Sequence, residues 1–401
     1  MIDLTFALGP FANDQPVIAN PEHTLLFAVN EGSNSVAVFY IGGDGALTPV
    51  AGSPFPSGGF QPVSLSLLGN TLTVVNKNED PAQASAEAVA QPNYTTFRVA
   101  DDGRLFPIAN STITATASPS QALSVVLEDS LIESRFGTSE DKDDSGLVFG
   151  ADFEGGNLQS FQLGRNGILR QNPPQPLPSA PFVGQTFEGG PAPALPLGLG
   201  VHPQLPILYV GFVTINEIGI YSFNREGTLN FIRTVDNPSQ GGNCWIAINR
   251  EGTRMYAVDT GSNQITVYDI ATDPLTPRAL AVTQLAGTGR AFELALSDDE
   301  RYLQAISQQG DATGSVADNT LHVLRVDSNG LLTEVQTDSL TQFVSNPRPG
   351  RAGWAWWPSD GRRNQISIVD ARTPAERSAK VALSVMLPFS GRRSATHAPP
   401  M

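Results

Sequence analysis

Several acidic and basic residues of this sequence stand where short apolar segments meet polar turns. The candidate catalytic residues that we single out are Glu31, Glu154, Glu293, Arg290 and Lys77. Similar positions are held by Asp152, Asp259 and Arg135. A carboxylate can take a proton from water, and a nearby cation can hold negative charge that develops on a substrate oxygen. These residue types are typical of hydrolytic acid–base chemistry if the segments that carry them converge. The alternative is that each caps a strand or pairs at the surface.

Histidine and cysteine offer weaker candidates for the same chemistry. We expect His23 and His202 to be solvated residues of the turns NPEHT and VHPQ, and His322 to lie on a strand face within LHVLRV. His397 lies near the end of the chain. Cys244 is the single cysteine, and no histidine stands near it in sequence to stabilise a thiolate. We therefore expect a small buried thiol, without an internal disulfide or a multi-cysteine metal site.

The candidate residues belong to a unit that recurs along the chain. One copy reads LLFAVNEGSNSVAVFYIGGDGALTPV over residues 25–50, and five further copies follow it. Each has an apolar run, a polar turn, an alternating strand and a tip of the form Asp/Asn/Glu-Gly-x-Leu before another strand. The tip glycine tolerates the positive φ that a tight hairpin requires. A short strand such as VIANPEHT or CWIAINREGT precedes most copies, which makes four strands per unit.

Units of four strands, repeated at a spacing of about 45 to 65 residues, predict an all-β fold of the β-propeller type. In this fold four-stranded blades surround a central channel, and residues at blade ends converge on the axis. A β-sandwich also contains alternating strands, but it would not repeat this order of strands and turns six times. We assign residues 1–358 to the propeller.

The composition is typical of a chain with many short strands, and it argues against nucleic acid as a partner and against a membrane span. The 401 residues include 38 Gly and 31 Pro, and only 16% are charged. A formal charge of −15 argues against nucleic acid, whose binding needs clustered Lys and Arg. No apolar run reaches the roughly 18 residues of a membrane-spanning helix, and the first residues lack the pattern of a signal peptide.

Residues 359–401 differ from the body of the chain. From Arg348 onward there are nine Arg or Lys and three Asp or Glu residues, which gives this part a net charge of +6. Because the whole chain has a formal charge of −15, the residues before Arg348 carry −21. The repeat is no longer evident, and TPAERSAKVALSVML fits one helix capped by Thr373. We expect a basic C-terminal extension that is either helical or disordered.

The repeats resemble those of the lactonase-like seven-bladed β-propellers, a family that includes bacterial 6-phosphogluconolactonases and fungal carboxymuconate-lactonizing enzymes. The stretches FAVNEGSNSVAVF (27–39) and CWIAINREGTRMYAVDTGSNQITVYDI (244–270) carry the likeness, which extends over about residues 15–355. They are especially similar to an exported bacterial branch of the family. The resemblance implies seven blades, of which six clear repeats and an incomplete blade are visible.

Two features depart from the family pattern. SLTQFVSNPRPGRAGWAWW (339–357) offers only one or two strands of a seventh blade. Either the ring has six blades, or the natural start of the protein is missing together with any signal peptide, and we favour the second. Gly-Gly-Asn-Cys-Trp at 241–245 stands where phosphogluconolactonase-like members have Gly-Pro-Arg-His. The Asn30–Glu31 pair after an inner strand does match the family.

We therefore expect a lactonase-like propeller that hydrolyses or binds a small lactone or sugar-acid ligand at the axial channel. A glutamate among Glu31, Glu154 and Glu293 would act as the base, and Arg290 or Lys77 would hold the oxyanion. No cofactor is implied. The alternative is a non-catalytic propeller scaffold that presents its face or channel to a protein partner or a ligand, and the absent Arg and His at 241–245 favour it.

Metal content and location are left open by the residues. Asn30, Asn76 and Asp259 recur at equivalent positions and have oxygen atoms that Ca²⁺ prefers, but they also suit turn construction. No metal is assigned. The exported branch implies a secreted or periplasmic full-length protein, and a cytoplasmic location is the alternative.

Overall fold

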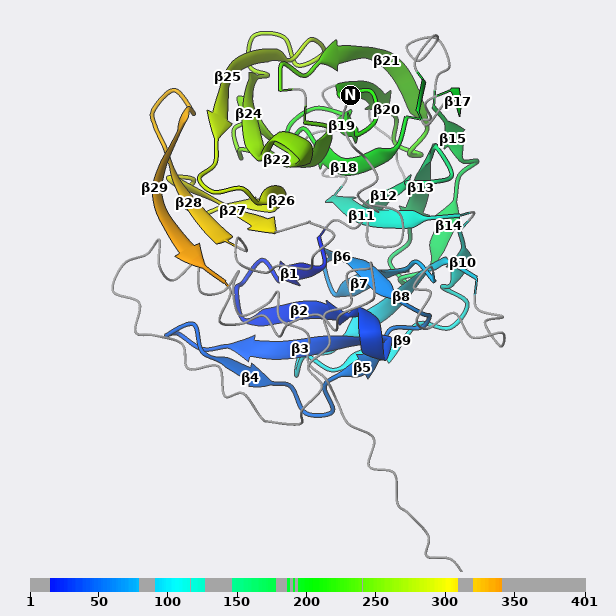
Figure 1. The fold of residues 1–401 in the computed structure, drawn as a ribbon. Helices are drawn as coiled ribbons and strands as arrows, with labels where there is room; N and C mark the ends of the chain where they lie inside the picture. Colours follow the sequence, from blue (N-terminus) through cyan, green and yellow to red (C-terminus); the bar gives the residue numbers. More distant parts are fainter. Residues whose placement is uncertain are drawn as a thin grey trace, which may run out of the picture.

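Alternating strands and glycine-tipped hairpins build a β-propeller of six blades in the computed structural model (Figure 1). The residues that the structure describes are 15–78, 91–115, 117–126, 146–177, 186–187, 190–191, 194–239, 241–308 and 320–340. Each blade is an antiparallel sheet, and its innermost strand comes first in the chain. The prediction of an all-β propeller with four-stranded blades is confirmed.

The first three blades have an outermost strand that is split into two short pieces, both paired with the third strand. Blade one contains β1 (Val17–Ala19), β2 (Leu25–Asn30), β3 (Ser35–Ile41), β4 (Leu47–Pro49) and β5 (Phe55–Pro56). Blade two contains β6 (Pro62–Leu68), β7 (Thr71–Asn76), β8 (Asn93–Val99), β9 (Leu105–Pro107) and β10 (Ile113–Thr114). Blade three contains β11 (Pro119–Val126), β12 (Gly146–Asp152), β13 (Asn157–Leu163), β14 (Leu169–Gln171) and β15 (Gln175–Pro176).

The last three blades have four continuous strands each, and a small hairpin of β16 (Thr186–Phe187) and β17 (Gly190–Pro191) precedes them. Blade four contains β18 (Pro196–Val201), β19 (Ile207–Phe212), β20 (Glu217–Phe223) and β21 (Leu229–Asp236). Blade five contains β22 (Asn243–Ile248), β23 (Arg254–Asp259), β24 (Gln264–Asp269) and β25 (Arg278–Gln284). Blade six contains β26 (Arg290–Leu296), β27 (Tyr302–Gln308), β28 (Thr320–Val326) and β29 (Leu332–Ser339).

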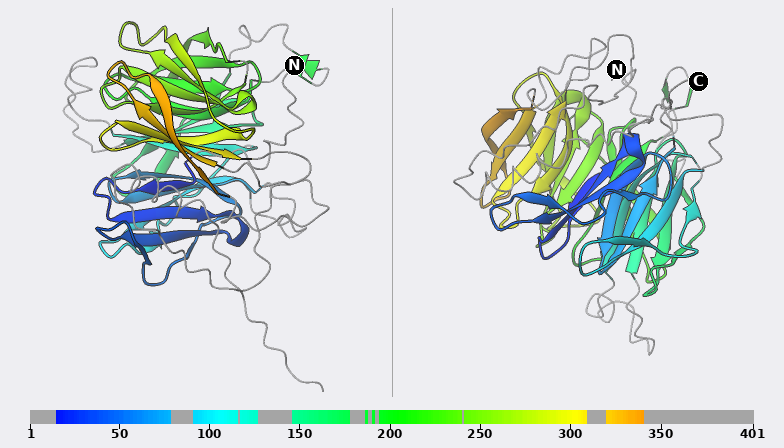
Figure 2. Two further views of the ribbon diagram at one scale, coloured as in Figure 1. Left: turned by 60° about the vertical axis from the view of Figure 1, so that its left-hand side comes forward. Right: turned by 90° about the horizontal axis from the view of Figure 1, so that it is seen from below.

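Figure 1 shows the inner strands gathered around the axis and the later strands of each blade farther out, and Figure 2 shows the same blades from two other directions. The predicted inner strands VIA, LGLGV, CWIAI and FELAL lie in β1, β18, β22 and β26. The Asn30–Glu31 pair requires a correction, because it follows β2, the second strand of its blade, and not the inner strand β1. Because β1 has only three residues, the longer apolar run of β2 looked more like an inner strand in the sequence.

The predicted hairpin tips are confirmed by their backbone geometry. Five tip glycines have φ between 74° and 81°, which are Gly45, Gly103, Gly167, Gly227 and Gly330. This left-handed conformation strains residues with a Cβ, so glycine at these positions sets where the third strand turns into the fourth.

Five of the six inner strands contain a β-bulge near their start. The register shifts lie between Pro62 and Ser64, Pro119 and Gln121, Pro196 and Leu199, Asn243 and Ile246, and Phe292 and Leu294. A bulge adds a residue that the partner strand does not match, so it bends the strand and redirects a side chain. The bulges thus bring inner-strand side chains into positions that a regular strand would not give them.

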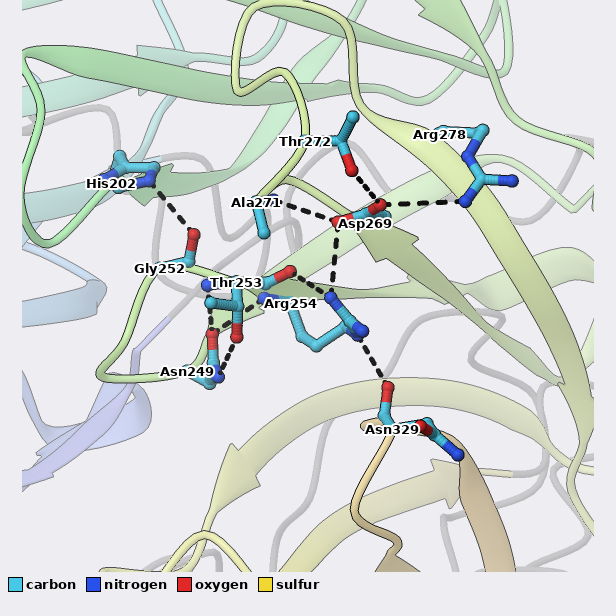
Figure 3. Close-up of polar contacts among 10 residues, drawn as sticks. All are labelled: His202, Asn249, Gly252, Thr253, Arg254, Asp269, Ala271, Thr272, Arg278 and Asn329. Atoms are coloured by element: carbon cyan, nitrogen blue, oxygen red, sulfur yellow. Dashed lines mark hydrogen bonds and ion pairs between the residues drawn. The ribbon is translucent and has the colours of Figure 1, made fainter.

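The end of the propeller where inner strands finish is held by polar contacts between blades (Figure 3). Arg254 donates to the Asn329 carbonyl of blade six at 2.7 Å and pairs with Asp269 at 3.3 Å. A hydrogen bond from Thr272 lowers the pKa of Asp269. His202 contacts the Gly252 carbonyl at 3.1 Å and is only 5% exposed, so the expectation of a solvated turn residue was wrong. The turn of blade four packs against the turn of blade five there.

Several predictions from the sequence lie outside the described residues. These are the partial seventh blade at 341–357, the extension at 359–401, Arg135 and His397. The domain boundary at residue 358 therefore stays a prediction. Within the described ranges, no helix has the length and apolar character that spanning a bilayer requires.

Because the inner strands pack closely, one methyl group added to a glycine of an inner strand should lower the stability of the protein. A Cβ at Gly198 of β18 would lie 2.1 Å from the Cys244 carbonyl oxygen, whereas a Cβ at Gly43 would meet nothing within 4 Å. We expect Gly198→Ala to lower the free energy of unfolding by about 1–3 kcal/mol, and Gly43→Ala to change it by less than about 0.5 kcal/mol. Urea unfolding of both variants measures this, and equal stabilities would contradict the packing.

Candidate functional site

The candidate residues gather at one end of the propeller because neighbouring strands of a blade run in opposite directions. The start of each inner strand lies beside the end of the second strand, as the pairing of Arg290 with Gln308 shows in blade six. We call this the inlet end. Glu31, Lys77 and Glu154 follow second strands and therefore lie at the inlet end, where Arg290 begins β26.

Three of the predicted catalytic residues have ordinary surroundings. Glu31 begins a short 3₁₀ turn, η1 (Glu31–Ser33), and is half-buried. Glu154 lies in the exposed turn after β12, and Arg290 is half-buried at the start of its strand. Their burial does not set them apart from other turn residues, so their catalytic roles stay predictions.

Glu293 has the most unusual environment of the predicted residues. It is the additional residue of the β-bulge in β26. The backbone N–H of Gln15 and the indole N–H of Trp245 donate to its carboxylate, while Oε1 is buried and has no partner among the described residues. Burial raises the pKa of Glu293 to about 8, and these two hydrogen bonds lower it only in part. A carboxyl group of this kind exchanges its proton near neutral pH.

The backbone of Gln15 links three blades at this point. Its N–H donates to Glu293 of blade six, and its carbonyl accepts from the N–H of Leu65 in blade two at 2.9 Å. Gln15 itself leads into β1 of blade one and has a left-handed backbone with φ of 57°. Such strain in a residue other than glycine persists where the surroundings hold it, and it often accompanies functional sites.

An apolar cluster beside Glu293 explains its raised pKa. Trp245, which follows Cys244 at the bulge of β22, packs its ring against Phe292 with centroids 5.0 Å apart. Phe153 and Leu197 belong to the same buried cluster, so blades three, four, five and six all contribute to it. Apolar neighbours give a carboxylate little solvation, which favours the protonated form.

Lys77 borders the same cluster from blade two. The residue is fully buried after β7, and its Nζ lies 5.7 Å from the centre of the Phe153 ring. The face of an aromatic ring attracts a cation, which offsets part of the cost of burying the ammonium group. Glu293, through its contact with Trp245, and Lys77, through its contact with Phe153, therefore both border one apolar cluster at the inlet end.

A buried polar network in blade five was not foreseen from the sequence. Asp259 accepts hydrogen bonds from Asn237 and from Thr266, the latter at 2.7 Å. Asn237 also accepts from the Tyr268 hydroxyl at 3.0 Å. Burial raises the pKa of Asp259 to about 7, against the lowering effect of these hydrogen bonds. The network joins Asn237, the residue after the last strand of blade four, to the second and third strands of blade five.

The other recurring Asn and Asp residues build turns. Asp152 accepts hydrogen bonds from the backbone N–H groups of Ser118 at 2.7 Å and Gly155 at 3.1 Å. Asn76 donates to the Ser57 carbonyl at 3.1 Å. These contacts support the structural interpretation of the repeated residues. Among the described residues, no group of three or more His, Cys, Asp or Glu side chains could hold a metal ion.

Blade six contains a relay of three side chains that sequence spacing did not reveal. Ser307 Oγ lies 2.7 Å from His322 Nε2, and His322 Nδ1 lies beside Glu334 Oε1. Ser307 is 1% exposed and His322 is fully buried, so the serine is closed to a substrate. Glu334 also accepts from the N–H of Ala286 in the segment from blade five, at 3.0 Å. The relay therefore lies within blade six, and Glu334 links it to the segment that follows blade five. His322 does lie on a strand, as expected.

Cys244 is a buried free thiol, as expected. Its Sγ lies 3.5 Å from the Gly242 carbonyl oxygen, and its side chain belongs to the apolar cluster beside Glu293. The segment Gly-Gly-Asn-Cys-Trp thus supplies packing and one indole N–H to the inlet end.

Comparison with known proteins supports the fold. No protein-family model and no curated protein matches the chain. The periplasmic gluconolactonase PpgL of Pseudomonas aeruginosa is 20% identical, with a TM-score of 0.60 over 79% of this chain and 82% of that one. A candidate 6-phosphogluconolactonase of Bacteroides uniformis is 15% identical, with a TM-score of 0.59 over 80% and 84%. A protein of Lactobacillus plantarum is 16% identical, with a TM-score of 0.58 over 79% and 82%. Such identities show a shared fold alone.

The raised pKa of Asp259 predicts how its variants respond to pH. The folded-state pKa of about 7 lies above the ordinary value of 3.8, so this carboxyl lowers stability as the pH rises from about 4 through 7. Asp259→Asn cannot ionise, and we expect it to be more stable than the parent by about 1–3 kcal/mol at pH 8 but not at pH 4. Urea unfolding at both pH values measures the difference.

The matched control is Asp259→Ala, which leaves Asn237 and Thr266 without their acceptor. It should lose about 1–3 kcal/mol relative to the parent at pH 4, and less at pH 8, because it also removes the group that ionises. If the stability difference between Asp259→Asn and the parent were the same at pH 4 and pH 8, the pKa of this carboxyl would not be raised in the folded protein.

Proposed function

We propose that this chain is a lactonase-like β-propeller that hydrolyses a small lactone, or binds the related sugar acid, at the inlet end of its axis. The observation that carries the proposal is Glu293, a half-buried residue whose Oε1 is buried without a partner among the described residues and whose pKa desolvation raises to about 8. Perturbed carboxyls beside a strand bulge are typical of general acid–base sites. The fold that this chain shares with a protein named as a gluconolactonase supports the choice of a sugar lactone.

The proposed reaction uses the carboxylate of Glu293 as a base and the cation of Lys77 or Arg290 to stabilise negative charge. The Glu293 carboxylate accepts a proton from water while the water oxygen attacks the carbonyl carbon of the lactone. Negative charge then develops on the carbonyl oxygen, and the cation of Lys77 or Arg290 holds it. When the tetrahedral adduct collapses, the ring C–O bond breaks, and the proton on Glu293 passes to the departing alkoxide. The product is the open hydroxy acid.

The pKa of Glu293 sets the expected pH dependence. The base is the deprotonated form, so the kcat/KM for glucono-δ-lactone should rise about tenfold per pH unit below pH 8 and level off above it. Glu293→Gln should lower kcat/KM by about 10² to 10⁴. The measurement is the enzyme-dependent rate after subtraction of spontaneous hydrolysis, from pH 5 to 9.

A matched control is Glu226→Gln, which changes an exposed glutamate in a hairpin tip of blade four. This variant should keep the parent rate at every pH. If the Glu293→Gln variant hydrolysed the lactone as fast as the parent, Glu293 would not be the base and the proposed reaction would be wrong.

A non-catalytic binding propeller is the second candidate. The observation that favours it is the apolar cluster of Phe153, Leu197 and Trp245, because such side chains can close the axis and leave no room for water. The raised pKa of Glu293 would then reflect burial alone. Calorimetry with gluconate and with glucono-δ-lactone separates the two, since a scaffold for small ligands would bind both without turnover.

We further propose that the full-length protein is exported to the periplasm or the medium. The resemblance of its repeats to an exported branch supports this location, and one structural neighbour is named as periplasmic. Fractionation of cells that express the natural full-length protein should place it outside the cytoplasm. Recovery with cytoplasmic markers would favour the alternative location.

A further inference from the structure

The hairpin tips of blades three and six contain the two Asn-Gly dipeptides of this chain, Asn166–Gly167 and Asn329–Gly330. Asparagine before glycine is open to a spontaneous reaction in which the glycine nitrogen attacks the side-chain amide carbon, because glycine has no side chain to hinder the approach. Both asparagines are exposed, and the two glycines have left-handed backbones with φ of 75° and 80°. The two dipeptides are therefore alike in sequence, exposure and position in their hairpins.

The main chain makes the same hydrogen bond in both tips. The N–H of Gly167 donates to the Gly164 carbonyl at 2.8 Å. In blade six, the N–H of Gly330 donates to the Asp327 carbonyl at 2.9 Å. The nitrogen that would attack is thus held alike in the two turns. A difference in reactivity must come from the asparagine side chains and from the groups around them.

The side chain of Asn166 is tied to its own turn. Its Oδ1 accepts from the N–H of Ile168 at 3.1 Å, an arrangement typical of asparagine in turns. Gly164 has no side chain that could take this N–H instead. The side-chain amide of Asn166 is therefore held by a hydrogen bond that must break before the nitrogen of Gly167 can attack.

The side chain of Asn329 is released by Asp327. Asp327 Oδ1 accepts from the N–H of Leu331, the equivalent of Ile168, at 2.9 Å. Because that N–H is occupied, the Asn329 side chain has no hydrogen bond within the part of the chain that the structure describes. Figure 3 shows it pointing away from Arg254. The side-chain amide of Asn329 is therefore free to rotate toward the next residue.

Arg254 favours the same reaction through the main chain. Its Nε donates to the Asn329 carbonyl oxygen at 2.7 Å, across the boundary between blades five and six (Figure 3). That carbonyl is conjugated with the nitrogen of Gly330, so a cationic donor withdraws electron density and makes the Gly330 N–H more acidic. The deprotonated nitrogen is the form that attacks. Asn329 thus has both a free side chain and an activated neighbour.

We propose that Asn329 is a site of spontaneous deamidation and isoaspartate formation, and that Asn166 in the equivalent turn is protected. The Gly330 nitrogen gives up its proton, and its electron pair forms a bond to Asn329 Cγ. The bond from Cγ to the amide nitrogen breaks, and ammonia leaves with that proton. Water then opens the cyclic imide at either carbonyl, which gives aspartate or isoaspartate. Both products replace a neutral residue by an anion.

The modification changes the contact between blades five and six. Isoaspartate adds one carbon atom to the main chain, and the former Asn329 carbonyl becomes a carboxylate beside Arg254. The hydrogen bonds that close the turn no longer match the longer chain. The inference concerns the chemical ageing of blade six and does not depend on the proposed catalytic function.

Peptide mapping of the full chain after incubation at pH 8 tests the proposal. Mass spectrometry, with an isoaspartate methyltransferase as the reagent for isoaspartate, measures both sites in one sample. Asn329 should react about five times faster than Asn166, which is the factor that one protein hydrogen bond of ordinary strength corresponds to. In the chain unfolded by urea the two rates should become similar, because the turns are lost.

Substitutions at Asp327 separate the hydrogen bond from the charge. Asp327→Gly leaves the N–H of Leu331 to Asn329, as in blade three, and should slow the reaction about fivefold. The matched control is Asp327→Asn, which keeps an acceptor oxygen without the charge and should leave the side chain of Asn329 as free as in the parent.

The converse exchange in blade three should release Asn166. A Cβ at Gly164 would lie 2.9 Å from Asn166 Oδ1, and the carboxylate of Gly164→Asp can take the N–H of Ile168. This variant should speed the reaction of Asn166 about fivefold. Equal rates at Asn166 and Asn329 in the folded parent would overturn the inference, and so would an Asp327→Gly variant that reacts as fast as Asp327→Asn.

Discussion

The structure depends on one constraint, which is that every blade has two apolar faces and both must be kept from water. A single four-stranded sheet cannot meet this requirement, so each blade relies on its neighbours, and burial of each Val, Leu or Phe is worth roughly 1.5–3 kcal/mol. Clusters such as the one that joins Phe27 and Val38 to Leu65 and Val74 satisfy it across five successive interfaces.

The same constraint shapes the inlet end. Inner strands crowd around the axis, and their bulges let Trp245 and Glu293 leave the regular alternation of a strand. Desolvation at the inlet end raises the pKa of Glu293 to about 8, in the range useful for proton transfer, although the hydrogen bond from Trp245 lowers it in part. Packing and chemistry therefore have one origin, because the apolar cluster that holds four blades together also tunes the candidate base. Lys77 is fully buried at the same end, and the ring of Phe153 attracts its ammonium group.

Much of this fold could be predicted from local sequence. The tip glycines mark their hairpins because only left-handed backbone closes those turns, and alternation marks the strands. Glu293 could be identified as a candidate because it stands in an inner strand. Its partners could not, since Gln15 and Trp245 come from other parts of the chain and only ring formation brings them to Glu293. The burial of His202 was missed for the same reason. The relay from Ser307 to Glu334 was missed because it depends on how three strands of blade six pair.

The most direct test of this account is the protonation state of Glu293 itself. In protein labelled with ¹³C at the glutamate carboxyl carbons, one resonance should titrate near pH 8 and should be absent from Glu293→Gln. Such a resonance would establish a buried carboxyl poised for proton transfer at the inlet end. If every glutamate instead titrates close to the ordinary pKa of about 4.3, Glu293 is solvated, and the central claim of a desolvated acid–base residue fails.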